Sequence, residues 1–248
     1  MNTVEIIFSP TGGTEKAAQI IAESFNNSIR KIDLSNYNTD FTKCEINKDD
    51  IVVIAMPSFG GRAPAVAIER LKEINGNGAD CVLVCVYGNR AYEDTLAEME
   101  DAAKECGFNV KAAISAVAQH SIFPQYAANR PDDADKKQLE QFAQQIIASN
   151  NTAPKIPGNR PYKEGGGRGV LPKPTNDCIS CGICAENCPV QAIDLLDFKA
   201  DSKKCISCMR CVKICPNNAR EINNAVASVV ALAIKKACSV KKSNELFI

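Results

Sequence analysis

The chain has 248 residues, of which 45% are hydrophobic and 23% charged, a composition typical of a soluble protein with one domain or a domain and a half. Lys and Arg total 29, as do Asp and Glu, and this balance argues against nucleic-acid binding as the main role. The N-terminal sequence lacks signal-peptide features and the longest apolar run, Ala225–Ile234, is too short to cross a bilayer, so we expect a cytoplasmic protein without membrane insertion.

From residue 1 to about residue 150, strand-like and helix-like segments alternate. We expect strands at Thr3–Phe8, Ile29–Leu34, Ile51–Met56, Cys81–Tyr87 and Val110–Val117. We expect helices at about Thr14–Phe25, Ala63–Ile74, Tyr92–Cys106 and Asp132–Ser149. Near-continuous apolar runs such as IVVIAM and CVLVCVY are typical of parallel strands that are covered on both faces. Residues 1–150 are therefore predicted to form a doubly wound α/β domain with a five-stranded parallel sheet and a ligand site at the carboxyl ends of the strands.

The segment 151–175 differs from what precedes it, because it holds five Pro, five Gly and five Lys or Arg against one Glu. This composition predicts an extended basic linker, either a solvated tether or a strap packed between domains. Residues 176–219 form a separate cysteine-rich unit. Residues 220–248 are predicted to be a C-terminal helix and tail, because the apolar residues of Glu221–Val240 have helical spacing.

Eight of the 13 cysteines lie between Cys178 and Cys215. They form two repeats 27 residues apart, CISCGICAENCP and CISCMRCVKICP, and each repeat reads C-x₂-C-x₂-C-x₃-C-P. Three thiolates at three-residue steps can hold one iron–sulfur cube, while the fourth, displaced by one residue, reaches the partner cluster. One predicted [4Fe–4S] cluster is thus bound by Cys178, Cys181, Cys184 and Cys215. The other is bound by Cys188, Cys205, Cys208 and Cys211.

Zinc and disulfides are the alternative uses of these cysteines. Structural zinc usually takes two separated C-x₂-C pairs, and disulfides are rare in a reducing compartment. The array resembles the bacterial-type ferredoxin with two [4Fe–4S] clusters over Asn176–Ala219, and all eight ligands are present. That resemblance implies a small α+β domain. The remaining cysteines, including Cys81 and Cys85, are expected to be core residues.

A turn rich in hydroxyl groups and glycine, SPTGGT at Ser9–Thr14, leads from the first predicted strand into a helix. It matches neither the nucleoside-triphosphate loop nor the dinucleotide fingerprint. A helix N-terminus with free N–H groups nevertheless favours an anion, and the absence of Lys and Arg from the turn suits a bound monophosphate. The alternative is a glycine-rich turn with an incidental helix cap at Thr14.

SPTGGT resembles the T/S-x-T-G-x-T phosphate loop of flavodoxins, a likeness that implies bound FMN. The phosphate contacts implied are Ser9, Thr11, Gly12, Gly13 and Thr14. The flavin ring is then expected between the loops MPSFGGRAPA and YGNRAYEDTL, which follow the third and fourth strands. The second loop is similar to a segment of flavodoxin-like proteins fused to ferredoxins. The ring contacts so implied are Phe59, Gly60, Gly61, Gly88, Asn89 and Arg90.

The chain has no Trp to stack on a flavin as in many flavodoxins. Phe59, Tyr87 or Tyr92 must take that place, or the second domain covers the ring. His120, the one histidine, follows the fifth strand, and we expect a structural or surface role for it.

Over nearly its whole length the sequence resembles the flavodoxin–ferredoxin fusion family of anaerobic microbes. The resemblance implies an electron-transfer iron–sulfur flavoprotein, a low-potential carrier that passes single electrons between two [4Fe–4S] clusters and FMN, with redox proteins as partners. We assign no catalytic residue. The alternative is a flavin-dependent reductase of a small substrate or of NAD(P)H, with Arg62 and Arg90 available to an anion. A redox-sensing module would need an output element, and the sequence offers none; the oligomeric state, including a homodimer, is left open.

Overall fold

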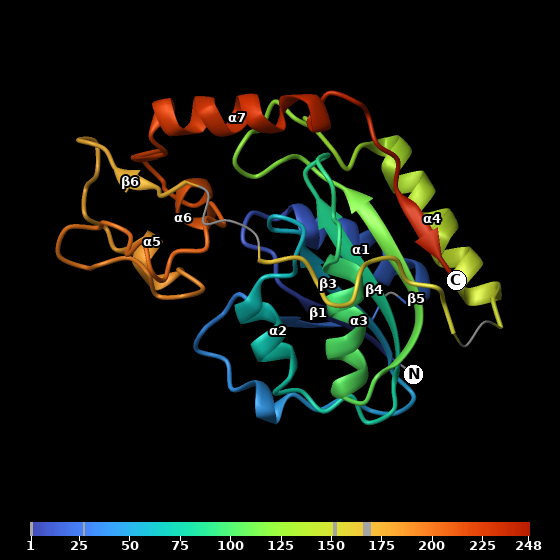
Figure 1. The fold of residues 1–248 in the computed structure, drawn as a ribbon. Coiled ribbons are helices and arrows are strands. Elements are labelled where there is room, and N and C mark those ends of the chain that lie inside the picture. Colours follow the sequence, from blue (N-terminus) through green and yellow to red (C-terminus); the bar gives the residue numbers. More distant parts are fainter. Residues whose placement is uncertain (1, 27, 151–152, 166–169) are drawn as a thin grey trace.

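The structure, a computed structural model, describes residues 2–26, 28–150, 153–165 and 170–248. Its larger part is a sheet domain in which one mostly parallel sheet lies between two layers of helices (Figure 1). The strands of this sheet in the described chain are β1 (Thr3–Ile7), β2 (Ile29–Asp33), β3 (Ile51–Pro57), β4 (Asp80–Tyr87), β5 (Asn109–Val117) and β8 (Glu245–Phe247). Their order is β2-β1-β3-β4-β5-β8. The order 2-1-3-4-5 of the parallel strands is flavodoxin-like and confirms the predicted fold class.

Helices cover both faces of the sheet. The helices α1 (Gly13–Phe25) and α4 (Asp133–Ala148) pack on one face. The helices α2 (Ala65–Leu71) and α3 (Thr95–Glu105) pack on the other, next to a short 3₁₀ helix at Phe41–Lys43. All of β1, and all but the first residue of β3 and of β4, are buried. Because these strands have no solvent-facing side, their sequences are continuous apolar runs rather than alternating ones.

Two helices begin later than predicted, and local backbone geometry explains both differences. The helix α2 starts at Ala65 because Pro64 is in an extended conformation with a ψ of 123°. The helix α3 starts at Thr95 because Glu93 has a φ of 44°, which interrupts a right-handed helix. In both cases the displaced residues become part of a loop at the carboxyl edge of the sheet.

All five predicted parallel strands are present, and the C-terminal tail adds a sixth, β8, which pairs antiparallel with β5. The side chain of Asn244 anchors the tail: its Oδ1 accepts the N–H of Val117 at 2.8 Å, and its Nδ2 donates to Asp135 at 2.9 Å. Without β8 the edge of β5 would present unpaired backbone groups, which proteins usually cover. The tail therefore belongs to the sheet domain in space, although it follows the cysteine-rich unit in sequence.

The cysteine-rich unit, here called the cluster domain, contains the short elements β6 (Lys173–Pro174), α5 (Ile183–Glu186), α6 (Arg210–Lys213) and β7 (Arg220–Glu221). Its internal duplication is visible in the fold, because α5 and α6 occupy equivalent positions of the two repeats. The bridge between Ile193 and Ala200 in one half corresponds to the pairing of β6 with β7 in the other. In Figure 1, α6 lies nearer to the sheet domain than α5.

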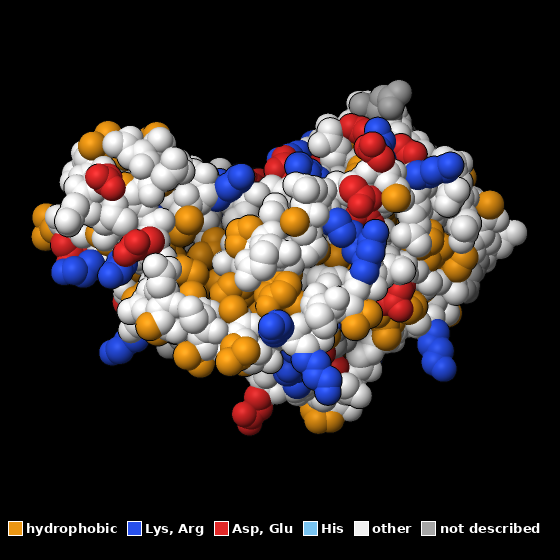
Figure 2. All heavy atoms as spheres, turned by 90° about the horizontal axis from the view of Figure 1, so that it is seen from above, with side chains coloured by type: hydrophobic (Ala, Val, Ile, Leu, Met, Phe, Trp, Pro, Cys, Tyr) orange, Lys and Arg blue, Asp and Glu red, His pale blue; other side chains and the backbone are white. Residues whose placement is uncertain are grey.

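The helix α7 (Asn224–Cys238) links the cluster domain to the tail and crosses above the carboxyl edge of the sheet (Figure 1). Seen from above, hydrophobic side chains gather on the face of the molecule that carries α7 (Figure 2). On α7 itself, Val229 is 70% and Leu232 is 72% exposed. Within the described residues, no helix has the length and apolar character needed to cross a membrane.

Candidate functional site

The turn between β1 and α1 lies at the carboxyl edge of the sheet. Gly12 precedes the helix with a φ of 89°, a left-handed conformation that glycine adopts without strain. The hydroxyl of Ser9 accepts a hydrogen bond from the N–H of Glu15 at 2.9 Å, which ties the turn to the first turn of α1. Thr14 is buried beside it. The unpaired N–H groups and positive dipole end of a helix favour an anion, so this local geometry fits a bound phosphate.

The loops that follow β1, β3, β4 and β5 line one cavity of about 460 Å³, here called the strand-end cavity. Seven of the predicted flavin contacts line it: Thr11, Gly13, Thr14, Phe59, Gly60, Gly88 and Arg90. The other four do not: Ser9, Gly12, Gly61 and Asn89. The loops meet here because all the parallel strands end at the same edge of the sheet.

Gly61 and Asn89 have other contacts. A Cβ atom at Gly61 would collide with the carboxylate of Glu93, and the φ of 88° at Gly61 also requires glycine. The buried side chain of Asn89 donates to the carbonyl oxygens of Cys238 at 2.7 Å and Val240 at 2.9 Å. Asn89 therefore fastens the end of α7 to the β4–α3 loop. Contact of either residue with a flavin ring stays a prediction.

His120 is part of the wall of the strand-end cavity. A Cβ atom at Gly88 would lie 2.7 Å from the Cβ of His120, so only glycine permits this approach of the two loops. The Nδ1 atom of His120 accepts hydrogen bonds from the N–H groups of Ile122 at 3.2 Å and Phe123 at 3.4 Å. Burial, and to a lesser degree the charge of Arg90, lowers the pKa of His120 to about 4. The imidazole is thus neutral at pH 7, with its proton on Nε2. In the sequence, only the position of His120 after the fifth strand indicated that it could lie at the site.

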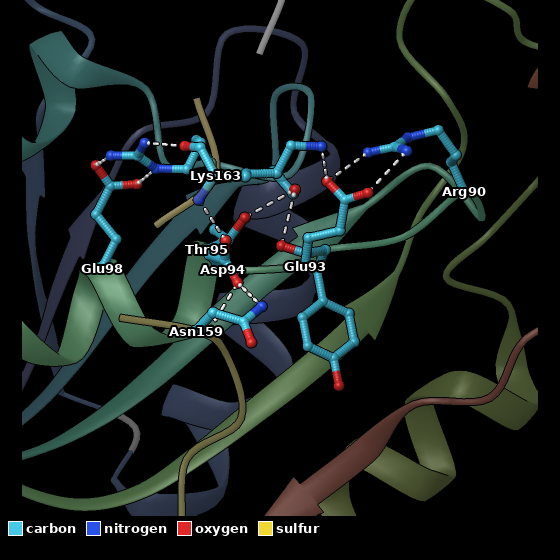
Figure 3. Close-up of polar contacts among 10 residues, drawn as sticks. Arg90, Glu93, Asp94, Thr95, Glu98, Asn159 and Lys163 are labelled. Atoms are coloured by element: carbon cyan, nitrogen blue, oxygen red, sulfur yellow. Dashed lines mark hydrogen bonds and ion pairs between the residues drawn. The ribbon is translucent and has the colours of Figure 1, made fainter. Parts of the chain in front are cut away.

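The linker is a strap over part of its length and not a free tether, although residues 151–152 and 166–169 of the predicted segment 151–175 lie outside the described residues. Residues 157–165, here called the strap, contact α3 and the residue before it; Figure 3 shows the contacts of Asn159 and Lys163 with Asp94. The carboxylate of Asp94 accepts the N–H groups of Lys163 at 2.7 Å and Asn159 at 2.8 Å. The hydrogen bond from Lys163 has the largest effect and, together with that from Asn159, lowers the pKa of Asp94.

Two arginines near the cavity are paired with carboxylates. Arg62 forms a bidentate pair with Glu98, at 2.8 Å from Nε and 2.7 Å from Nη2, and also donates to the carbonyl oxygen of Lys163 at 2.6 Å. Glu93 accepts both terminal nitrogens of Arg90 and the ammonium of Lys163 (Figure 3). The strap thereby brings Lys163, and with it Glu164, into the wall of the cavity.

Residues far along the chain complete the strand-end cavity. Ile206 and Ser207 come from the second cysteine repeat, and Val230 and Ile234 come from α7. None of them carries a motif for a flavin site, and no sequence signal pointed to them. They reach the cavity only because the cluster domain and α7 fold back over the carboxyl edge of the sheet.

The cluster cysteines form two groups in space. One small cavity is lined by Cys178, Cys181, Cys184 and Cys215, here called the first cysteine set. Another is lined by Cys188, Cys205, Cys208 and Cys211, the second cysteine set. This is the grouping that the repeat spacing predicts. Among the described residues, no group of three or more His, Cys, Asp or Glu side chains is arranged to hold a single metal ion. Four thiols line each cavity, which is the number of ligands that a [4Fe–4S] cluster takes.

Backbone groups and a helix of the sheet domain position the second cysteine set. The N–H of Ala192 donates to Cys188 Sγ at 3.3 Å, and its counterpart in the duplication, the N–H of Ala219, donates to Cys215 Sγ at 3.2 Å. Arg70 on α2 donates to the carbonyl oxygen of Pro189, the residue after Cys188, at 2.6 Å. The core cysteines are different: burial raises the pKa of the Cys81 and Cys85 thiols, which pack inside the sheet domain.

Comparison with known proteins gives one family match. Residues 177–219 match the sequence profile of the family described as a 4Fe-4S dicluster domain. The matched segment contains all eight cluster cysteines and ends before α7. No curated protein matches the chain significantly.

Several solved structures are similar to the sheet domain. The flavodoxin of Streptococcus pneumoniae TIGR4 is 22% identical, the match covers 59% of this chain and 98% of that chain, and the TM-score is 0.41. The Fusobacterium nucleatum flavodoxin bound to flavin mononucleotide is 17% identical, with 60% and 98% covered and a TM-score of 0.40. The rubredoxin oxygen:oxidoreductase of Desulfovibrio gigas is 18% identical over 60% of this chain, with a TM-score of 0.40, and the match spans 36% of that enzyme.

Proposed function

We propose that this protein transfers single electrons between two [4Fe–4S] clusters and FMN. The observation that carries the proposal is a shared cavity: the turn before α1 and the loop of Ile206 and Ser207 line the same space. That loop lies between two cysteines of the second set, Cys205 and Cys208. FMN supplies one- or two-electron chemistry and each cluster supplies one-electron chemistry, so their combination in one chain suits electron transfer.

The residues around the strand-end cavity fit FMN. The phosphate is held by N–H groups at the start of α1 and by the hydroxyl of Thr11, next to the left-handed turn at Gly12. Phe59 and Tyr87 offer aromatic side chains to the ring. Apolar side chains of the cluster domain and α7 close the cavity from the other side. In this arrangement the second domain covers the ring, which accounts for a flavin site without Trp.

The two cysteine sets are the ligand sets in this proposal, and they differ in their surroundings. The second set adjoins the strand-end cavity through Ile206, whereas Ile179, the equivalent residue of the first repeat, is 63% exposed. The cluster of the second set is therefore the partner of the flavin. The cluster of the first set, with Cys181 at the surface, exchanges electrons with a redox protein.

A reductase that binds an anionic substrate at the flavin is less well supported. The cationic side chains considered for that role, Arg62 and Arg90, are each held by a carboxylate, Glu98 and Glu93. A substrate anion would have to compete with these pairs. Oxidation of NAD(P)H by the purified protein without any partner would favour the reductase over the carrier.

Anaerobic purification followed by iron, sulfide and flavin analysis tests the proposal. About eight iron atoms and one FMN per chain are expected, because each cluster of the paired pattern holds four irons. Stepwise reduction with dithionite should then show separate cluster and flavin signals. About one zinc atom and no flavin per chain would contradict the proposal.

A further inference from the structure

Arg220, the first residue of β7, is a buried cation between the two cysteine sets. It is 4% exposed. Its Nη1 donates to the carbonyl oxygen of Phe198 at 2.8 Å and lies 3.5 Å from Cys184 Sγ of the first set. Its Nη2 donates to the carbonyl oxygen of Pro172 at 3.1 Å. The guanidinium also interacts with the thiol of Cys211, which belongs to the second set.

The hydrogen bonds leave the charge of Arg220 uncompensated. Its partners are carbonyl oxygens and sulfur, its Nε is buried without a hydrogen-bond partner, and no carboxylate of the described residues forms an ion pair with it. An arginine side chain keeps its positive charge in proteins, and a buried charge is costly unless an opposite charge lies close by. Thiolate-bound iron–sulfur clusters carry negative charge, so clusters in the two sets would supply the missing counter-charge.

The duplication shows that this cation is not a property of the repeat itself. The position 27 residues before Arg220 is Ile193, which takes part in the equivalent antiparallel bridge. One side of the duplicated domain thus has an apolar residue where the other has a charge. Nη1 is aimed at Cys184, so the cluster of the first set receives the closer contact.

We infer that Arg220 sets the reduction potentials of both proposed clusters, raising that of the first cysteine set more than that of the second. The inference rests on the proposed function. Reduction adds a negative charge to a cluster, and a fixed positive charge beside the thiolates stabilises that reduced state. The effect is large here because the charge of Arg220 is buried, so that screening by salt is weak.

The test is a redox titration of the full, cluster-loaded protein, followed by electron paramagnetic resonance. Arg220→Met removes the charge and keeps an apolar stem. It should lower the potential of the first-set cluster by about 59 mV, a tenfold change in a one-electron equilibrium constant. The potential of the second-set cluster should fall by less. In Arg220→Lys both potentials should stay near those of the parent. Lys203→Met removes an exposed lysine of the same domain and should change neither potential.

The outcomes separate this inference from the proposed function. Unchanged potentials in an Arg220→Met protein that holds both clusters would overturn the inference and leave the function standing. A parent protein without eight irons would overturn the function itself. If Arg220→Lys assembles clusters while neither Arg220→Met nor Arg220→Gln does, the charge is needed for cluster assembly and the inference about the potentials is overturned. Failure of all three would show a packing role only.

Discussion

The two cysteine repeats have almost the same sequence but lie in different environments. Cys181 of the first repeat is exposed, whereas the equivalent Cys208 is buried. Ile179 is 63% exposed, whereas its counterpart Ile206 packs on the sheet-domain core and lines the strand-end cavity. The two halves of a duplicated unit are equivalent only as long as neither half contacts another part of the protein. Because one half is docked against the sheet domain, two loops of similar sequence become an inner, enclosed cysteine loop and an outer, exposed one.

The contacts that produce this difference come from the sheet domain and from α7. Arg70 holds Pro189 on the inner side, and Asn89 fastens the end of α7. The hydroxyl of Ser207 donates to the carbonyl oxygen of Val170 in the linker at 2.8 Å. The outer half has no comparable anchors to the sheet domain among the described residues. Substitutions at equivalent positions of the two halves should therefore have unequal effects.

The largest effect is expected from loss of the ligands that cross between the repeats. Cys188→Ala should remove the cluster next to the flavin, and Cys215→Ala should remove the outer one, because each fourth cysteine belongs to the opposite set. Each variant should retain about four of eight irons. Only Cys188→Ala should stop rapid flavin reduction by the remaining cluster in stopped-flow experiments. Cys44→Ala is the control, and loss of the outer cluster signal in Cys188→Ala would refute the pairing.

Thr14→Asp should remove FMN and leave the iron content unchanged. A carboxylate at the buried start of α1 would repel the FMN phosphate, and like charges in contact cost several kcal/mol, so flavin affinity should fall at least about 100-fold. Flavin retained after gel filtration, compared with iron content, measures the effect. Gln19→Asp adds the same charge on the exposed side of α1 and should retain FMN. FMN content equal to that of the parent in Thr14→Asp would exclude this phosphate site.

The hydrogen bond between Asn244 and Asp135, which anchors the C-terminal tail to the sheet domain, should make the stability of the protein sensitive to acid. Burial by itself raises the pKa of Asp135, but hydrogen bonds from Arg130, from the N–H of Asp132 and from Asn244 lower it to about 2. The unfolded value is about 3.9, so this stabilisation is complete above that pH and is lost as the pH falls toward 2. The free energy of unfolding should drop by about 2 kcal/mol over this range.

Urea unfolding followed by circular dichroism from pH 6 to pH 2 checks the acid effect. Asp135→Asn should be less stable than the parent at pH 6 and should show a flatter dependence on pH. Asp49→Asn, a change at an exposed site, is the control. Parallel pH curves for the parent and Asp135→Asn would contradict the assignment.

The smallest effect is expected from the equivalent isoleucines. Ile206→Ala removes part of a half-buried side chain and should lower the free energy of unfolding by about 1–2 kcal/mol. Ile179→Ala changes an exposed side chain and should stay within about 0.5 kcal/mol of the parent. Denaturant midpoints of the two variants, measured side by side, give the comparison. Equal losses would mean that the two halves are equally enclosed.

Local sequence patterns were sufficient to predict several strands, the grouping of the cysteines and one turn. The apolar runs predicted β1, β3 and β4, because strands covered on both faces need continuous apolar side chains. The repeat spacing predicted which cysteines share a cavity, since that grouping is set within one short unit. The turn at Gly12 could also be recognised, because its conformation depends on neighbouring residues.

Other features required contacts between residues far apart in the sequence. The strand β8 contains only Glu245–Phe247, too short to be distinguished from a loop, and exists because the edge of β5 was available. The strap depends on Asp94 finding N–H groups more than sixty residues away. The hydrogen bonds of the Asn89 side chain to Cys238, the last residue of α7, and to Val240 also join segments about 150 residues apart.

The sequence by itself determined the type of sheet, the cysteine pattern and the glycine-rich turn before α1, because each arises from short-range periodicity or spacing. Only the tertiary structure decided which cysteine set faces the strand-end cavity and how Arg220 comes to lie between the two sets. Both depend on how the cluster domain and α7 fold back over the sheet. Such docking is governed by the complementarity of distant surfaces, and no local stretch of sequence encodes it.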